Sequence, residues 1–234
     1  MRLLVIDAAC KGLSLAVAEE DKLLATAALN VGKTHSQRLL PLLDDLLREG
    51  DLELKDIDLV GVIVGPGSFT GLRIGISTAK AIAYALGVDV IPIKTTDALA
   101  GNCVGMGSLI CPVLDARKNE VYYGIYDENG KPLEETAAME PLALAEYLKN
   151  NYPSQEVIFL GDAADIYMDS FIGVLGERAH LAPPALRYFM AASAACYGFA
   201  HLTDAVSPAE VKAFYLRPSS AEKQRKERLR QNGK

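Results

Sequence analysis

The feature that most restricts the fold is a succession of elements that occurs twice along the chain of 234 residues. In the first copy, an apolar strand ends at Asp7, a short turn follows, and two more strands complete an antiparallel meander. A second apolar strand ends at Asp115 and leads into the same succession. Fifteen positions separate Asp7 from Lys22, and fifteen also separate Asp115 from Gly130. This equal spacing predicts a tandem duplication.

Each copy continues with a helix, a buried strand and a second helix. The predicted ranges are 35–49, 59–64 and 68–87 in the first copy, and 141–149, 157–160 and a helix after Asp162 in the second. The chain is therefore predicted to be α/β with a duplicated βββαβα unit. That unit is typical of the two-domain actin-like (ASKHA, ribonuclease H-like) architecture, in which a nucleotide lies between the domains.

The expected domain boundaries follow from the repeat. Residues 1–105 form the N-terminal actin-like domain, 106–217 form the C-terminal one, and 218–234 form a basic tail. An alanine-rich helix over 192–202 is expected to pack back on the first domain, and residues 214–217 read as a last strand or extended piece.

A glycine-rich turn joins the buried strand to the helix in the first copy. Proline and glycine in Gly65-Pro66-Gly67 stop the strand, and Ser68 or Thr70 caps the helix that Gly87 ends. Free N–H groups and the helix dipole favour an anion at such a terminus. The spacing matches neither GxGxxG nor the Walker pattern. The candidate nucleotide or phosphate residues are Asp7, Gly65, Gly67, Ser68 and Asp115.

The two helices of the first copy each have a face that one domain does not obviously use. Gly71, Gly75, Ala79 and Ala83 recur every four residues and form a ridge almost without side chains, which allows close packing. The neighbour lies either in the same chain or in a partner protein. The helix over 35–49 has leucines on more than one face, so a second face is expected to be buried elsewhere.

Motifs for catalysis or metal binding are absent from the sequence. The three histidines form neither HxxxH nor HExxH, and there is no GxSxG elbow. The four cysteines lack CxxC spacing and are typical of reduced thiols. We therefore predict no catalytic residue and no metal site.

Charge is distributed unevenly along the chain. The net charge of −6 argues against nucleic-acid binding by the body of the protein. From Arg217 onward, seven Lys or Arg against two Glu give +5 and leave −11 for the rest. Such a tail is most often solvated, and an RNA contact there is an alternative. Met1-Arg2 leads directly into a strand, and no apolar run reaches the roughly 20 residues of a membrane span, so we expect a cytoplasmic protein.

Several motifs resemble one known family. The segment from Gly65 to Gly75, GPGSFTGLRIG, is similar to the signature of the bacterial TsaB (YeaZ) family. Other matching segments occur in the same order: His35-Ser36 with Leu39-Leu40-Pro41, Asp115-Ala116-Arg117 with Glu120-Val121-Tyr122, and Tyr215-Leu216-Arg217. The resemblance covers nearly the whole chain. One departure is Asp7-Ala8-Ala9, where the family usually has Asp-Thr-Ser, and it weakens the case for a nucleotide site in this subunit.

The resemblance implies an accessory role. Proteins of this family are non-catalytic subunits that bind and activate a paralogous transferase, TsaD, which makes N6-threonylcarbamoyladenosine next to the anticodon of tRNAs reading ANN codons. An ATPase, TsaE, joins the complex, and tRNA is contacted indirectly. The transferase carries a metal-binding HxxxH near the positions of Thr95 and Leu99, which cannot replace imidazole ligands. No cofactor of its own is implied, although ATP or ADP at the complex interface stays open.

The resemblance also implies a partner interface, used for the transferase or for a homodimer in its absence. It is formed by the two helices of the first copy, and the expected residues are His35, Leu39, Leu43, Leu46, Gly71, Leu72, Gly75, Ala79 and Ala83. The alternatives are an actin-like nucleotide-binding ATPase or kinase, and a glycoprotease-like peptidase, for which the sequence shows neither nucleophile nor zinc site.

Overall fold

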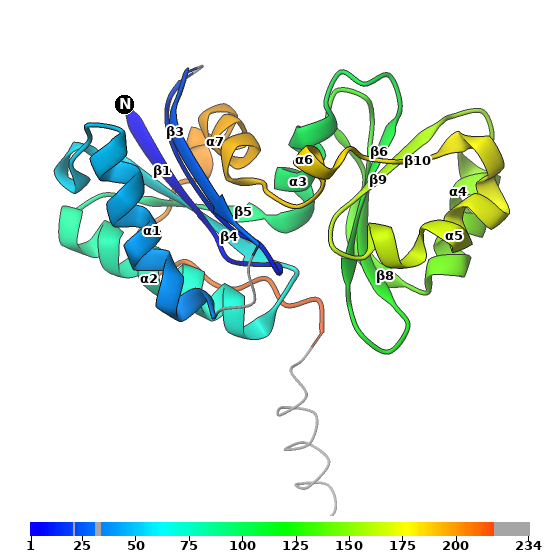
Figure 1. Cartoon of the computed structure of the whole chain (residues 1–234), viewed down its shortest axis with the longest axis horizontal. Coiled ribbons are helices and arrows are strands. Elements are labelled where there is room, and N and C mark those ends of the chain that lie inside the picture. Colours follow the sequence, from blue (N-terminus) through cyan, green and yellow to red (C-terminus); the bar gives the residue numbers. More distant parts are fainter. Residues whose placement is uncertain (21, 31–33, 218–234) are drawn as a thin grey trace, which may run out of the picture.

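The computed structural model describes residues 1–20, 22–30 and 34–217 and contains two five-stranded sheets (Figure 1). The first half consists of β1 (Arg2–Asp7), β2 (Leu13–Glu19), β3 (Lys22–Leu29), α1 (His35–Glu49), β4 (Leu59–Gly65), α2 (Phe69–Leu86) and β5 (Val90–Lys94). The second consists of β6 (Leu109–Asp115), β7 (Val121–Tyr126), β8 (Pro132–Met139), α4 (Pro141–Asn151), β9 (Val157–Leu160), α5 (Ala164–Leu175) and β10 (Ala179–Leu181).

In the described part of the chain, three further helices lie outside the repeat. They are α3 (Thr95–Ala100), α6 (Pro184–Arg187) and α7 (Ala191–Ala200). Short 3-10 turns occupy η1 (Leu54–Asp56), η2 (Gly101–Cys103), η3 (Gly176–Arg178) and η4 (Leu202–Asp204).

The topology confirms the predicted duplication. The first sheet has the order β3-β2-β1-β4-β5, and the second has the matching order β8-β7-β6-β9-β10. In both sheets the first strand pairs antiparallel with the second and parallel with the fourth; Ile6, for example, lies opposite Leu15 and Val62. The sequence missed β10 and α6, which are too short to produce a period.

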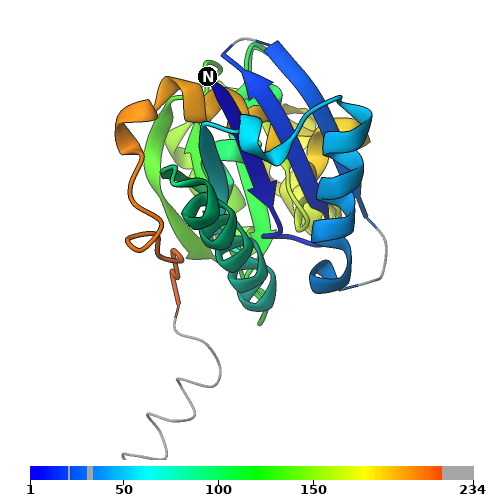
Figure 2. The ribbon, with the colours of Figure 1, turned by 90° about the vertical axis from the view of Figure 1, so that its left-hand side faces the viewer.

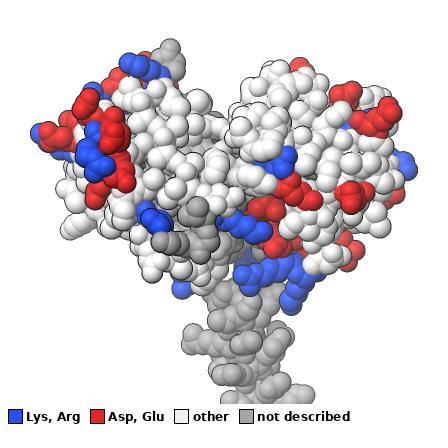
Figure 3. All heavy atoms as spheres, viewed as in Figure 1, with Lys and Arg blue, Asp and Glu red and all other residues white. Residues whose placement is uncertain are grey.

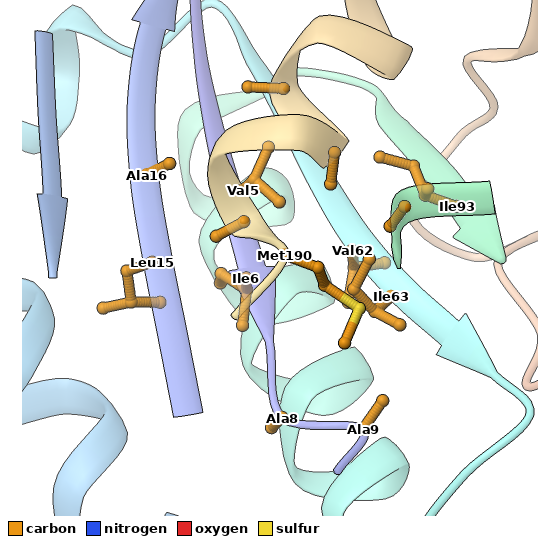
Figure 4. Packing of buried hydrophobic residues seen from close by; sticks show 14 of the residues in the cluster. Val5, Ile6, Ala8, Ala9, Leu15, Ala16, Val62, Ile63, Ile93 and Met190 are labelled. Carbon is orange, nitrogen blue, oxygen red and sulfur yellow. The ribbon is translucent and has the colours of Figure 1, made fainter. Parts of the chain in front are cut away.

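Helices cover both faces of the first sheet. The helices α1 and α2 lie on one face and α7 lies on the other (Figures 1 and 2). An added Cβ at Gly198 of α7 would lie 2.7 Å from Cδ2 of Leu3, so the small residues of α7 let it approach the sheet closely. Just before α7, Met190 lies over Ile6 and Val62 (Figure 4). The prediction that the alanine-rich helix packs back on the first half is confirmed.

One hydrophobic cluster extends across both halves of the chain. The main cluster extends from the first sheet to Ile110, Tyr126 and Leu160 of the second, while a separate core fills the space between the second sheet and α4 and α5. The hydroxyl of Tyr126 donates to Asp97 of α3 at 2.6 Å, which adds a polar contact between the halves. Because burial across the halves is hydrophobic and continuous, a loose hinge is not expected.

A C-terminal segment, residues 205–217, returns along the first half (Figure 2). Val206 and Val90 exchange two backbone hydrogen bonds of 2.9 Å, and Phe214 N donates to Val64 O at 2.8 Å. At its end, Arg217 forms a two-bond ion pair with Glu120, in the turn between β6 and β7. The segment is extended without being a regular strand, and it ties the edge of the first half to the second.

Candidate functional site

The leucines of α1 that were predicted to face a partner lie inside the chain. Leu39, Leu43 and Leu46 are buried and belong to the core of the first half. They recur every three or four residues, which is the spacing of a single helix face, and that face packs on the sheet. Leu40 is 54% exposed, so the surplus apolar surface of α1 lies at this other position. Leu39, Leu43 and Leu46 therefore serve the core of the chain, and Leu40 is the exposed leucine of α1 that a partner could cover.

The ridge of α2 is likewise packed against the chain itself. Added Cβ atoms would lie 2.1 Å from Ala8 O at Gly71 and 3.4 Å from Ala8 Cβ at Gly75. Further along the ridge, Ala79 and Ala83 are fully buried, as is Leu72 nearby. The ridge therefore packs against the same chain, which is the first of the two alternatives, and a role of these residues at a partner interface stays a prediction. The physical reason is that β1 continues into a turn that crosses directly under the helix.

The candidate phosphate loop is occupied by the same turn. An added Cβ at Gly67 would lie 2.4 Å from Ala9 O, and at Gly65 it would lie 2.5 Å from Phe214 O. Ser68 N donates to Ala9 O at 2.7 Å, and Ser68 Oγ caps the helix by accepting from Gly71 N. The turn after β1 thus lies against the start of α2 and takes the Ser68 N–H, so an anion at this terminus would have to share the space with Ala9.

The two strand-ending aspartates have different surroundings. Asp7 is fully buried and accepts hydrogen bonds from Ala9 N (3.0 Å) and Ser14 Oγ (2.8 Å). Burial raises the pKa of Asp7 to about 6. In contrast, Asp115 is exposed and accepts from the backbone N of Arg117 at 2.7 Å. One carboxyl lies inside the core and the other at the surface, so the two do not form the shared phosphate site that the sequence suggested.

A shallow groove lies between α1 and α2 on their outer side. Its volume is about 510 Å³, and its lining is Ser36, Leu39, Leu40, Phe69, Thr70, Arg73, Ile74, Ser77 and Thr78. Arg73 is the only charged residue of this lining. In Figure 3 the surface around α2 is mostly white, which marks residues other than Lys, Arg, Asp and Glu. Charged residues gather instead at the end of the first half that points away from the second half, at the upper left of the view. We call the groove and the adjoining exposed positions of α2 the outer helix face.

Sequence reasoning overlooked this face, although a signal for it was present. Thr70, Ser77 and Tyr84 recur every seven residues on the side of α2 opposite the glycine ridge, and Tyr84 is 84% exposed. Exposed Ala81 lies on the same side. Small and uncharged side chains on the solvent side of a helix are typical of a surface that another protein covers.

His35 and the aromatic residues frame one end of the groove. His35 Nε2 lies 2.8 Å from Cys10 O and so fixes the start of α1 to the turn after β1. The Phe69 ring lies 5.1 Å from that of Tyr215, and the guanidinium carbon of Arg73 lies 3.9 Å from the Phe69 centroid. The C-terminal segment thus reaches the edge of the outer helix face.

The described part of the chain contains no group of three or more His, Cys, Asp or Glu arranged to hold a metal ion. Thr95 and Leu99 are both buried in α3. Over the described ranges, no helix combines the length and the apolar character needed to cross a membrane.

The comparisons with known proteins agree with this fold. The family model of tRNA N6-adenosine threonylcarbamoyltransferase, TsaD, matches residues 29–220. A Bacillus subtilis protein named tRNA threonylcarbamoyladenosine biosynthesis protein TsaB is 31% identical over 186 residues, which are 79% of this chain and 81% of that protein.

Solved structures also resemble this chain. YeaZ from Pseudomonas aeruginosa has a TM-score of 0.75 and 26% identity and covers 92% of this chain and 99% of its own. The ROK hexokinase from Thermus thermophilus, at 13% identity and a TM-score of 0.50, covers 84% of this chain and 98% of its own and shows the actin-like fold alone. The predicted duplicated actin-like architecture is confirmed. The chain therefore belongs to the TsaB family, whose members are also called YeaZ.

Proposed function

We propose that this chain is a non-catalytic subunit that dimerises with a TsaD-like transferase and activates it. The product is N6-threonylcarbamoyladenosine next to the anticodon of tRNAs reading ANN codons. The name of the Bacillus subtilis relative, a tRNA threonylcarbamoyladenosine biosynthesis protein, supports this pathway. The matched TsaD family model supports a paralogue of the same fold as the partner.

We propose that the transferase binds on the outer helix face. This face combines an apolar groove with small exposed side chains on α2. Burying such a surface is favourable by roughly 25 cal/mol per Å² of apolar area, and small residues let a partner helix approach closely. In the absence of the transferase, a second copy of this chain occupies the same face, so homodimer and heterodimer compete.

The contact of the glycine loop with Ala9, through Ser68 N, and the burial of Asp7 support the non-catalytic part. Any ATP or ADP then binds at the interface of the complex, where the transferase and a TsaE-like ATPase contribute groups that this chain lacks. Contact with tRNA is indirect.

A binding measurement with a matched pair of variants tests this function. Ala81→Arg places an unpaired charge on the outer helix face, while Asp169→Arg places one on the exposed side of α5 in the second half. We expect Ala81→Arg to weaken binding of the cognate transferase at least about tenfold, because a desolvated unpaired charge is costly, and Asp169→Arg to leave it unchanged.

The readouts are light scattering after size-exclusion chromatography and tRNA modification by the mixture. Circular dichroism melting checks that both variants fold. Nucleotide turnover by the isolated chain, lost in Asp7→Ala, would favour the ATPase alternative instead. Absence of any complex with the wild type would overturn the docking proposal.

A further inference from the structure

An arginine stands on the outer helix face without a counter-charge. Arg73 is exposed and lines the groove, and no ion pair within the described residues includes it. Its neighbours in the groove are apolar or hydroxyl-bearing. A partner that covers the groove also covers this guanidinium and removes it from water. Because an unpaired buried charge is costly, the covering surface has to supply an acceptor for it.

The guanidinium is held in place by a stack of planar groups. It lies over the Phe69 ring with 3.9 Å between its carbon and the ring centroid. On the C-terminal segment, the Tyr215 ring packs against Phe69 at a centroid distance of 5.1 Å and an interplanar angle of 31°. Stacking occupies one face of the guanidinium and leaves its in-plane N–H donors available for a two-bond contact with a carboxylate.

The C-terminal segment holds this stack from two sides. Phe214 N donates to Val64 O at 2.8 Å, and Lys94 Nζ lies 5.3 Å from the Phe214 ring centroid. Arg217 pairs with Glu120 of the second half. Tyr215 lies between these two attachments and is therefore fixed at the edge of the groove. An arginine that is oriented before binding loses less side-chain entropy on forming its contact.

We propose that Arg73 is the specificity anchor of the docking surface and that it receives an Asp or Glu carboxylate of the partner protein. Tyr215 acts as a positioning residue through Phe69. This inference rests on the proposed function and adds the chemistry that the partner must present. A protein carboxylate is favoured over a nucleic-acid phosphate because the groove has one cation among apolar and hydroxyl-bearing residues. In addition, Asp44, Asp45 and Glu49 lie further along α1, the other helix of the groove, where they would repel a phosphate backbone.

The test measures the dissociation constant of the cognate transferase at several salt concentrations. Arg73→Gln is expected to weaken binding roughly 30-fold or more, as for other charge pairs that lose one partner, and to reduce the salt dependence. Arg73→Lys is expected to recover only part of the affinity, since an ammonium group lacks the planar fork. The control is Arg48→Gln, which removes an exposed arginine that pairs with Asp45 on the other helix and should bind as the wild type does.

The positioning role has its own readout. Tyr215→Phe keeps the stacked ring and should retain wild-type affinity and salt dependence, whereas Tyr215→Ala should weaken binding several-fold. Melting curves separate weaker binding from unfolding, and little loss of stability is expected because the Tyr215 side chain is 42% exposed. If Tyr215→Ala binds the transferase with wild-type affinity, Tyr215 has no positioning role.

Three results would overturn the anchor. The first is Arg73→Gln binding within about threefold of the wild type, and the second is a wild-type affinity that does not change with salt. The third is that Arg73→Gln binds the transferase as the wild type does but that its complex retains less tRNA. This result would mean that Arg73 contacts a tRNA phosphate. Failure of the wild type to bind the transferase at all would instead count against the proposed function, so the two failures are distinguishable.

Discussion

The turn that follows the fourth strand approaches another backbone closely in both halves, but its surroundings differ. In the first half, an added Cβ at Gly67 would lie 2.4 Å from Ala9 O; in the second, one at Gly161 would lie 2.3 Å from Val113 O. Each glycine thus lets this turn approach the backbone near the end of its half's first strand. In the second half Asp162 adds an acceptor for Asp115 N at 3.0 Å. The duplication has preserved a close backbone contact.

What differs is how much of the chain covers that contact. In the first half, Ala191 N at the start of α7 donates to Ser14 Oγ, and the C-terminal segment lies beside Gly65. As a result Asp7 is buried, while its counterpart Asp115 is exposed. Segments outside the repeat therefore decide whether the strand end is open. The comparison teaches that a duplicated backbone does not imply duplicated chemistry.

The largest expected effect tests the close approach in the first half. In Gly71→Ala the new methyl group would lie 2.1 Å from Ala8 O, so the helix or the turn has to move. We expect the free energy of unfolding to fall by about 3 kcal/mol, which exceeds the roughly 1 kcal/mol that alanine gains in a helix. Urea denaturation measures it. An unchanged stability would mean that α2 does not rest on this turn.

Asp7→Asn tests the difference between the strand ends. Burial raises the pKa of Asp7 from 3.8 to about 6, so between these pH values the folded protein holds a proton that the unfolded chain has released. Stability therefore falls as the pH rises through this window, and the buried carboxylate is unfavourable at pH 7. We expect Asp7→Asn to raise the free energy of unfolding by about 1 to 3 kcal/mol at pH 7 and much less at pH 4.

The matched control is Asp115→Asn at the exposed strand end, for which we expect a change below about 0.5 kcal/mol. Denaturant titrations at both pH values give the comparison. Destabilisation of Asp7→Asn at pH 7 would contradict the burial argument and would show that the hydrogen bonds from Ala9 and Ser14 outweigh the desolvation of the carboxylate.

Tyr126→Phe tests whether the two halves behave as one unit. The substitution removes the 2.6 Å hydrogen bond to Asp97 and keeps the buried ring. Loss of a bond to the half-buried carboxylate of Asp97 is expected to cost about 1 to 2 kcal/mol. If the halves share one core, thermal unfolding stays a single transition; two separate transitions would show that they unfold independently.

The smallest effect is expected at Gly173 on α5, where an added Cβ meets nothing within 4 Å. Gly173→Ala should stabilise the protein by about 0.5 to 1 kcal/mol, because glycine is the poorer helix former. The opposite signs at Gly71 and Gly173 would show that helix glycines are required only where a backbone crosses beneath them. Differential scanning calorimetry of both variants checks this.

The sequence predicted the fold well because periodicity and turn chemistry are local signals. The equal spacing after Asp7 and Asp115 revealed the duplication, and Ser68 and Gly87 mark the ends of α2 as observed. The site was predicted less well. The leucine stripe and the glycine ridge were interpreted as docking faces, because a sequence shows that a face is apolar or smooth without showing what covers it.

The sequence by itself determined the repeated βββαβα unit, the glycine turn, the lack of metal-binding motifs and the family resemblance, since each depends on residue type and spacing along the chain. Only the tertiary structure decided that Ala8 and Ala9 lie beneath α2, that Asp7 is buried, and that Arg73, Phe69 and Tyr215 form one stack. These contacts join residues as far apart as 69 and 215. The physical reason is that burial and stacking depend on which distant segments meet, and no local period encodes that choice.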